Sequence, residues 1–437
     1  MIITDKAQIK IAELRESNNL RLSGSDELEC YELIESDLKL PADVTFARSS
    51  VAYLSDGTQV AANTPRFEQG RFGKAIMVEE GTENIGSPAS LFDDSWTLAN
   101  GASTILDTYT RKYTFTSTSF GAFAYKNFTL TVGIIYTWSA EVKGEGNTIG
   151  KQVHLQCNAE NAFGTPVTLT SKWQRVTLTF TATNTARAVG FIGIPVDAFA
   201  VGDVVYIRNF QWEQKHYATS FTDGTRAAET PEVPTEGVLN PQEGTVECWV
   251  YFPPSGRWSV AGQAPTIFWA GSNSTGVSVN QIYADIVDQG TLRLVIYDSS
   301  NAYKLIQTTS AITSGWHYLA YKWDGTGPLA ICVDGVKQST TTVDMGTGVC
   351  SSVERFTLGF NGYDNARQIN SLIDDLRISN RARTDAEILA AYQSGQPLLV
   401  DEWTTYKLDF DNKILDFDNK IRITTQGQII CNELIEI

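Results

Sequence analysis

The stretch INSLIDDLRISNRARTDAEILAAYQSG, residues 369–395, decides the fold because it passes from a strand pattern into a capped helix. Its first part alternates apolar and polar residues as a half-buried strand does, and the pair Asp374-Asp375 interrupts the alternation as a β-bulge would. Thr384 with Glu387 three positions later is the capping-box pattern of a helix N-terminus, and Gly395 is typical of a helix end. We expect the apolar stripe of this helix to consist of Ile388, Leu389 and Tyr392.

Residues 237–398 contain short apolar runs separated by turn residues, and Asp334-Gly335 between two of these runs predicts a tight β-hairpin turn. The segment resembles the laminin-G-like domains of concanavalin type. Their last strand reads Ile-Asp-Asp/Glu-Val/Leu-Arg-Ile and is followed by Asn-Arg-Ala and a short helix. The resemblance implies a jelly-roll β-sandwich. The matching residues are Ile373, Asp374, Asp375, Leu376, Arg377, Ile378, Asn380, Arg381 and Ala382.

Asp374 and Asp375 are candidate ligands for Ca²⁺, which prefers several oxygen ligands. Some laminin-G-like domains bind calcium at one rim, so the resemblance agrees with this interpretation. The alternative is structural, with one aspartate paired to Arg377 or a loop arginine and the other facing water. Apart from this candidate calcium ion, the sequence requires no cofactor.

Residues 87–222 form a run of alternating segments that predicts another β-sandwich. From SWTLANGA (95–102) to IRNFQWEQKHYATSF (207–221), the order resembles carbohydrate-binding-module jelly rolls, especially those in phage tail proteins that end in Glu-x-x-x-x-Ala-Thr-Ser-Phe. Such modules bind sugars through aromatic platforms on a concave sheet, because a pyranose has an apolar face and a rim of hydroxyls. A Trp within a strand is also a common core anchor, so both interpretations stay open. The glycan-binding candidates are Trp96, Tyr113, Tyr125, Trp138, Trp173 and Trp212.

Residues 46–86 resemble the prelude that precedes binding domains in many phage tail and fibre proteins. In those preludes an Arg-Ala-Ser-like start, an Ala-Tyr segment, an Asn-x-Pro-Arg-Phe turn and a Glu-Glu-x-x-Thr-Asn ending follow in order. The residues that match the prelude are Arg48, Ser49, Ala52, Tyr53, Gly57, Asn63, Pro65, Arg66, Phe67, Glu79, Glu80, Thr82 and Asn84.

The segment that follows the first predicted sandwich, residues 223–236, is polar and contains two prolines, so we expect a linker.

The two ends of the chain, residues 1–45 and 399–437, have related sequences that are rich in charge and alternate apolar with polar residues. Residues 18–35 and 419–436 align without a gap, so we expect the two ends to take the same local fold and to serve in assembly. The tandem copy LDFDNKILDFDNKI, residues 408–421, predicts short strands alternating with Asp-Asn turns, and its composition disfavours a coiled coil. The candidate assembly residues are Arg21, Cys30, Glu32, Leu33, Ile34, Arg422, Cys431, Glu433, Leu434 and Ile435.

Composition excludes several classes of protein. The formal net charge of −16, without a basic cluster, argues against a nucleic-acid partner. No stretch is apolar and long enough to insert in a membrane, and the first residues do not resemble an export signal. The six cysteines are spread singly, so we expect free thiols made in a reducing compartment, with a Cys332–Cys350 disulfide as the alternative.

Together these features predict an all-β protein with two tandem β-sandwich (jelly-roll) domains flanked by short β-rich assembly segments. The resemblances imply a non-enzymatic structural protein of a bacteriophage virion, in a tail, a fibre or the head surface, that adheres to host-surface polysaccharide. We expect assembly in the bacterial host cytoplasm, contacts with other virion proteins, and a homo-oligomer, with a trimer as the working assumption. Two alternatives remain: a capsid decoration or connector protein without sugar binding, and an accessory subunit of a polysaccharide-degrading enzyme.

Overall fold

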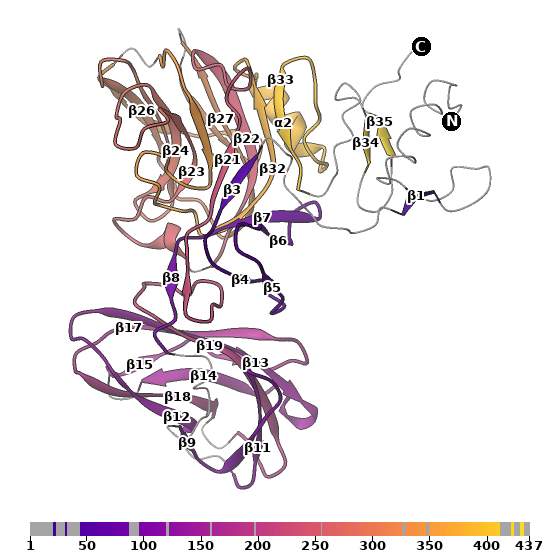
Figure 1. Cartoon of the computed structure of the whole chain (residues 1–437), viewed down its shortest axis with the longest axis vertical. Helices are drawn as coiled ribbons and strands as arrows, with labels where there is room; N and C mark the ends of the chain where they lie inside the picture. The colour runs from indigo at the N-terminus through magenta and orange to yellow at the C-terminus, as the bar shows by residue number, and fades with distance from the viewer. Residues whose placement is uncertain are drawn as a thin grey trace.

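The computed structural model describes residues 44–86, 96–118, 122–157, 160–195, 198–254, 256–325, 328–346 and 349–410, and four short strands outside these ranges. Strands dominate these residues, and α2 (Asp385–Gln393) is the one α-helix among them. Figure 1 shows two β-sandwiches, one above the other, joined by a narrow neck. The predicted all-β class with two sandwiches is confirmed.

The lower sandwich of Figure 1, called the inserted sandwich, comprises residues 96–213. Its apolar residues alternate along the strands, which places one face of each sheet in a shared core. The five-stranded sheet has the order β10 (Gly101–Ile105), β11 (Thr110–Phe115), β19 (Val204–Glu213), β13 (Ile135–Glu145) and β17 (Gln174–Thr181). The six-stranded sheet has the order β15 (Ala162–Phe163), β14 (Gln152–Cys157), β18 (Ala186–Ile194), β12 (Ala122–Thr129) and β9 (Thr97–Leu98), with β16 (Val167–Thr168) beside β14. The 3₁₀-helix η2 (Gly146–Thr148) follows β13.

The upper sandwich, called the host sandwich, has two sheets of eight strands. The first has the order β3 (Thr45–Ala47), β21 (Thr230–Val233), β31 (Arg355–Leu358), β23 (Thr266–Gly271), β24 (Gln281–Val287), β25 (Thr291–Tyr297), β26 (Tyr303–Thr308) and β30 (Thr340–Asp344). The second has the order β29 (Val336–Lys337), β28 (Ala330–Val333), β27 (Gly315–Asp324), β22 (Glu243–Phe252), β32 (Ser371–Ser379), β7 (Lys74–Val78) and β6 (Arg66–Gln69), with β33 (Thr404–Leu408) beside β32. The 3₁₀-helix η4 (Arg257–Ser259) follows β22.

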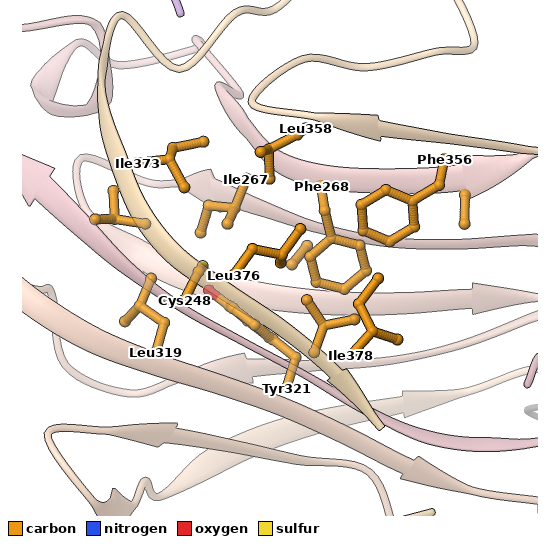
Figure 2. Close-up of a cluster of buried hydrophobic side chains, with 14 of the residues drawn as sticks. Cys248, Ile267, Phe268, Leu319, Tyr321, Phe356, Leu358, Ile373, Leu376 and Ile378 are labelled. Carbon is orange, nitrogen blue, oxygen red and sulfur yellow. The ribbon is translucent and has the colours of Figure 1, made fainter. Parts of the chain in front are cut away.

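The core of the host sandwich lies between these two sheets, and both contribute to it (Figure 2). Phe268 of β23 and Phe356 of β31 stack with ring centroids 5.6 Å apart, and Tyr321 of β27 packs edge-on against Phe268. Cys248 of β22 lies in the same cluster as a buried thiol, whose pKa burial raises. Cys157, Cys332 and Cys350 are also buried and form no disulfide, as the spread of the cysteines predicts.

The two sandwiches are nested, which differs from the tandem order that the sequence suggests. Strands β3, β6 and β7, from the predicted prelude, belong to the sheets of the host sandwich, because β3 pairs with β21, β7 pairs with β32, and β6 pairs with β7. Residues 223–236 do not form the expected linker, because they contain β21 and β20 (Thr225–Arg226). Strand β20 pairs with β8 (Thr82–Glu83), and these two strands form the neck through which the chain enters and leaves the inserted sandwich (Figure 1).

Three local predictions are confirmed. The side chain of Thr384 accepts a hydrogen bond from the Glu387 N–H at the start of α2, and both halves of the capping box are present. Asp334 and Gly335 both have positive φ between β28 and β29, as a tight hairpin turn requires. The register between β22 and β32 shifts at Asp375, which has a φ of 57°, so the predicted β-bulge is present.

The chain ends contain two short hairpins. Strand β1 (Arg21–Leu22) pairs with β2 (Tyr31–Glu32), and β34 (Ile421–Ile423) pairs with β35 (Ile429–Cys431). Both pairs are antiparallel, and β1 and β34 lie at aligned positions, but β35 precedes the residues that align with β2. Arg21 faces Glu32 whereas Arg422 faces Ile430, so the registers of the two pairs differ. The other assembly candidates lie outside the described residues: Cys30, Leu33, Ile34, Glu433, Leu434 and Ile435.

Candidate functional site

Four of the six aromatic candidates for glycan binding lie in the core of the inserted sandwich, which corrects the prediction for them. Trp138 and Tyr113 are fully buried, and Trp96 and Trp212 are 6% and 8% exposed. Trp138 and Trp212 stack with their ring centroids 4.8 Å apart. The cause is strand alternation, which puts Trp138 on the same inward face of β13 as other core residues. A sugar cannot reach these four rings.

The other two candidates, Tyr125 and Trp173, are half-buried and lie on opposite sheets of the inserted sandwich. Tyr125 stands on β12, where it faces Gly190 of β18. Trp173 immediately precedes β17, at the edge of the five-stranded sheet. The structure therefore does not bring the two rings together, and Trp173 lies among charged side chains, because Lys143 and Arg208 contact its ring.

Trp173 lies beside two rows of residues on the outer face of the five-stranded sheet. In the first row Lys112 of β11, Tyr206 of β19 and Lys143 of β13 face one another. In the second row Arg208 of β19 faces Glu141 of β13. We call these six residues the Tyr206 face: Lys112, Glu141, Lys143, Trp173, Tyr206 and Arg208.

The side chains of the Tyr206 face contact one another through rings and cations. The Arg208 guanidinium lies 4.4 Å from the Trp173 ring centroid, and its Nε lies 2.6 Å from a carboxylate oxygen of Glu141. The Lys143 ammonium lies 4.8 Å from the ring centroid of Trp173 and 4.9 Å from that of Tyr206. These cation–π contacts hold the long side chains along the sheet while the rings stay half-buried.

A turn that precedes the inserted sandwich in the chain lies beside the Tyr206 face. The turn between β4 (Ala52–Tyr53) and β5 (Gln59–Val60) reaches the inserted sandwich, where Arg208 donates to the backbone carbonyls of Asp56 at 3.1 Å and Ser55 at 3.3 Å. Figure 1 shows β4 and β5 in the space between the two sandwiches, above the sheet that contains β13 and β19. The Asp56 carboxylate accepts from the Thr58 N–H at 2.7 Å. The Tyr206 face is therefore located at the junction of two domains, where binding sites are common.

A buried ion network fixes this junction. It consists of Arg48, Arg66, Glu79, Arg226 and Glu229, and none of their side chains is more than 6% exposed. Arg66 binds Glu229 through two hydrogen bonds of 2.8 and 2.7 Å, and Arg48 reaches the same carboxylate at 2.8 Å. Burial opposes the charge of Glu79, but Arg226 and Arg66 outweigh it and hold the pKa of this carboxyl below its usual range.

The network connects both sandwiches. Glu79 accepts a hydrogen bond of 2.9 Å from the N–H of Ser220, in the segment that follows the last strand of the inserted sandwich. Glu213 of β19 accepts from the hydroxyls of Thr82 and Thr219 at 2.6 and 2.5 Å, so the neck is fixed from its other side. Most of these residues belong to the two motifs that resemble phage tail sequences. The motifs thus encode the joint between the sandwiches and do not themselves form a ligand surface.

An open pocket of about 510 Å³ adjoins the joint. No aromatic ring of the described residues lines it, so it lacks the platform on which a sugar would stack. The Tyr206 face is therefore the better candidate. The lining residues are Gly81, Thr82, Glu83, Ile85, Gln214, Lys215, Thr225 and Arg226.

The two calcium candidates make structural contacts. Asp374 accepts hydrogen bonds from the N–H groups of Arg71 and Phe72 at 2.8 and 3.0 Å, and burial raises its pKa to about 6. Asp375 pairs with Lys407 and accepts from the N–H of Leu398. Neither aspartate pairs with Arg377, which binds Glu247 instead. In the described part of the chain, no cluster of three or more metal-ligating side chains is present.

Sequence reasoning missed Lys112, Lys143, Tyr206 and Arg208. The text VVYIRNF, residues 204–210, contains a usable signal, because alternation along β19 places Tyr206 and Arg208 on one face and the apolar residues between them on the other. The rows across β11, β19 and β13 depend on pairing between strands that are distant in sequence, which the sequence alone does not indicate.

Comparisons with known proteins agree with the fold of the host sandwich. The family model of the concanavalin A-like lectin/glucanases superfamily matches residues 222–389, from just before the neck strand β20 into helix α2. The match does not include β3, β6 or β7. No curated protein sequence matches the chain.

Among the described residues, no helix has the length and apolar character that crossing a membrane requires.

Several solved structures are similar to part of the chain. The receptor-binding domain of botulinum neurotoxin mosaic serotype C/D is 16% identical with a TM-score of 0.30, and the match covers 38% of this chain and 40% of the toxin domain. The CBM40 of the Ruminococcus gnavus IT-sialidase, bound to α2,3-sialyllactose, is 13% identical with a TM-score of 0.29, covering 36% and 83%. Domain 4 of the Geobacillus stearothermophilus arabinanase AbnA, in complex with arabinotriose, is 23% identical with a TM-score of 0.27, covering 40% and 79%.

Proposed function

We propose that the protein is a non-enzymatic glycan-binding protein and that the Tyr206 face is its binding surface. The observation that carries this proposal is the position of Trp173, half-buried on a polar sheet face beside Tyr206 and the β4–β5 turn. An aromatic ring there offers the apolar contact that a pyranose face requires, and the surrounding charged groups offer partners for its hydroxyls. The match of the host sandwich to a lectin/glucanase family model supports the same class of ligand.

Binding assays on a tryptophan variant test this proposal. Trp173→Ala removes the platform, so its affinity on a polysaccharide array should fall by about tenfold or more, which corresponds to a loss of at least about 1.4 kcal/mol of binding free energy. Phe163→Ala is the matched control, because Phe163 is an aromatic residue 52% exposed on β15 of the other sheet. Equal binding by Trp173→Ala and wild type, at equal thermal stability, would contradict the proposal. So would a wild-type protein that binds no glycan.

We further propose that the protein is a structural component of a bacteriophage virion, in a tail, a fibre or the head surface, and that it attaches the particle to host-surface polysaccharide. The order of the motif residues that now form the joint supports this assignment. The terminal hairpins would associate with other copies and other virion proteins, and assembly in the host cytoplasm agrees with the four described buried cysteines that form no disulfide. Antibody labelling of intact particles in electron micrographs tests the assignment. Particles that contain no copy of the chain would refute it.

A further inference from the structure

The Tyr206 face differs in charge from the chain as a whole. The chain has a formal net charge of −16. On this sheet face, however, the cations Lys112, Lys143 and Arg208 stand with Arg175 of β17, the next residue in the second row. Their acidic neighbours on the sheet are Glu141, which Arg208 binds, and Glu145, which accepts from the Tyr206 hydroxyl. The face is therefore locally positive on an acidic protein.

The two lysines are the cations whose charge is available to a ligand. Among the described residues, no carboxylate lies within 4.0 Å of the ammonium group of Lys112 or Lys143, whereas Lys151 of the same sandwich pairs with Asp203. Their contacts are with rings: the Lys112 ammonium lies 5.9 Å from the Tyr206 centroid, and that of Lys143 lies 4.9 Å from it. Both ammonium groups thus flank one ring, and both side chains are partly exposed and form no ion pair with a described carboxylate.

An uncompensated pair of ammonium groups around an aromatic platform favours an anionic ligand. A neutral sugar would leave both charges without a partner, whereas a carboxylate would supply one. Glu141 and the Asp56 carboxylate do not compete for the lysines, because they already accept from Arg208 and from the Thr58 N–H. The strongly negative chain would repel such a ligand at other surfaces, so the local charge also selects where it binds.

We infer that the Tyr206 face binds acidic glycans, with sugar carboxylates as in uronic or sialic acid polymers, and that Lys112 and Lys143 bind the carboxylate while Trp173 contacts the sugar ring. This inference rests on the proposed glycan-binding function and specifies its ligand class. It assigns the preference for charge to the two lysines and the general affinity for sugar to Trp173. The two roles are separable by experiment.

The test uses the full chain with three polymers: polygalacturonate, the same polymer after reduction of its carboxyl groups, and polysialic acid. Wild type should bind the two acidic polymers at least about tenfold more tightly than the reduced polymer. This preference should disappear near 1 M salt, where the Debye length is about 3 Å. The double variant Lys112→Ala/Lys143→Ala should lose the preference and keep its affinity for the reduced polymer.

A matched control removes the same charge elsewhere. Lys126→Ala/Lys337→Ala takes one lysine from the six-stranded sheet and one from β29 of the host sandwich, and it should bind all three polymers like wild type. Lys112→Arg/Lys143→Arg should restore the preference. If wild type binds the reduced polymer as tightly as the acidic ones, the inference is overturned and the proposed function stands. If none of the three polymers binds, the inference is likewise overturned. If the polysaccharide array also shows no bound glycan, or if Trp173→Ala binds like wild type, the proposed function itself fails.

Discussion

Glu229 is the residue on which the joint depends most. Its carboxylate, fully buried, accepts from Arg66 and Arg48, and its removal would leave both guanidinium groups without their main counter-charge. Breaking a buried ion pair from one side typically costs about 3–5 kcal/mol. Glu229→Gln keeps the shape and removes the charge, so we expect it to lower the free energy of unfolding by about this amount in thermal or denaturant unfolding.

The control for this variant is Glu83→Gln, an exposed carboxylate on the neck strand β8. Substitutions of exposed residues usually change stability by less than about 0.5 kcal/mol. If both variants unfold at the wild-type temperature, the ion network does not stabilise the joint.

The buried carboxyl of Asp374 should make the free energy of unfolding depend on pH. Burial raises its folded-state pKa to about 6, above the value of about 3.9 expected in the unfolded chain. Between about pH 4 and pH 6 the folded protein therefore holds the proton more tightly, and the contribution of this group to stability is lost as the pH rises through that window. The loss amounts to at most about 3 kcal/mol.

Asp374→Asn removes this titration and keeps an oxygen that can accept from the N–H groups of Arg71 and Phe72. Its stability relative to wild type should therefore increase from pH 4 to pH 6 and then stay constant. Unfolding free energies of the two proteins over this range measure the difference, with exposed Asp344→Asn as the control. A difference independent of pH would show that Asp374 does not titrate in this window.

At the scale of single residues, what the sequence could predict depended on how far each residue's partner lies along the chain. The capping pair Thr384 and Glu387 was predictable because both members lie within one turn. The partner of Arg48 and Arg66 was not predictable, because Glu229 lies more than 160 positions away, in a segment whose sequence is typical of a polar linker. The same polar composition serves a buried network and a solvated linker, and only the tertiary fold distinguishes them.

At the scale of elements, strands and tight turns were predictable, and their partners were not. Alternation and Asp334-Gly335 indicated the hairpin of β28 and β29 directly. The pairing of β3 with β21 joins segments about 185 positions apart, so no local pattern indicated it. Strand β33 is similar: it pairs with β32, and Leu408 and Phe410 are buried in the host core. The first copy of the repeat LDFDNKI thus begins inside the sandwich. Residues 411–420 of the repeat lie outside the described residues, and its last residue, Ile421, begins β34.

At the scale of the molecule, the nested order determines which parts can fold alone. The cores of the two sandwiches share no residue, and the host core includes Phe67, Ile76 and Val78 from before the insertion. Without β7, strand β32 would also lose a paired neighbour. We therefore expect residues 223–410 alone not to fold, although they contain all but one residue of the family match. Residues 44–84 joined to residues 224–410 should restore folding.

The neck offers a direct way to make this joined fragment. Glu83 and Thr225 face each other across β8 and β20, so deleting residues 85–223 leaves Asn84-Gly224 as a two-residue loop, the favoured sequence for such a hairpin. The fragment loses the Ser220 contact to Glu79 but keeps the pairs of Arg66 and Arg226 with Glu79. It should unfold cooperatively on heating and show dispersed amide NMR signals, and residues 223–410 should show neither. Cooperative unfolding of residues 223–410 alone would mean that β3, β6 and β7 pack on the host sandwich but are not required for its folding.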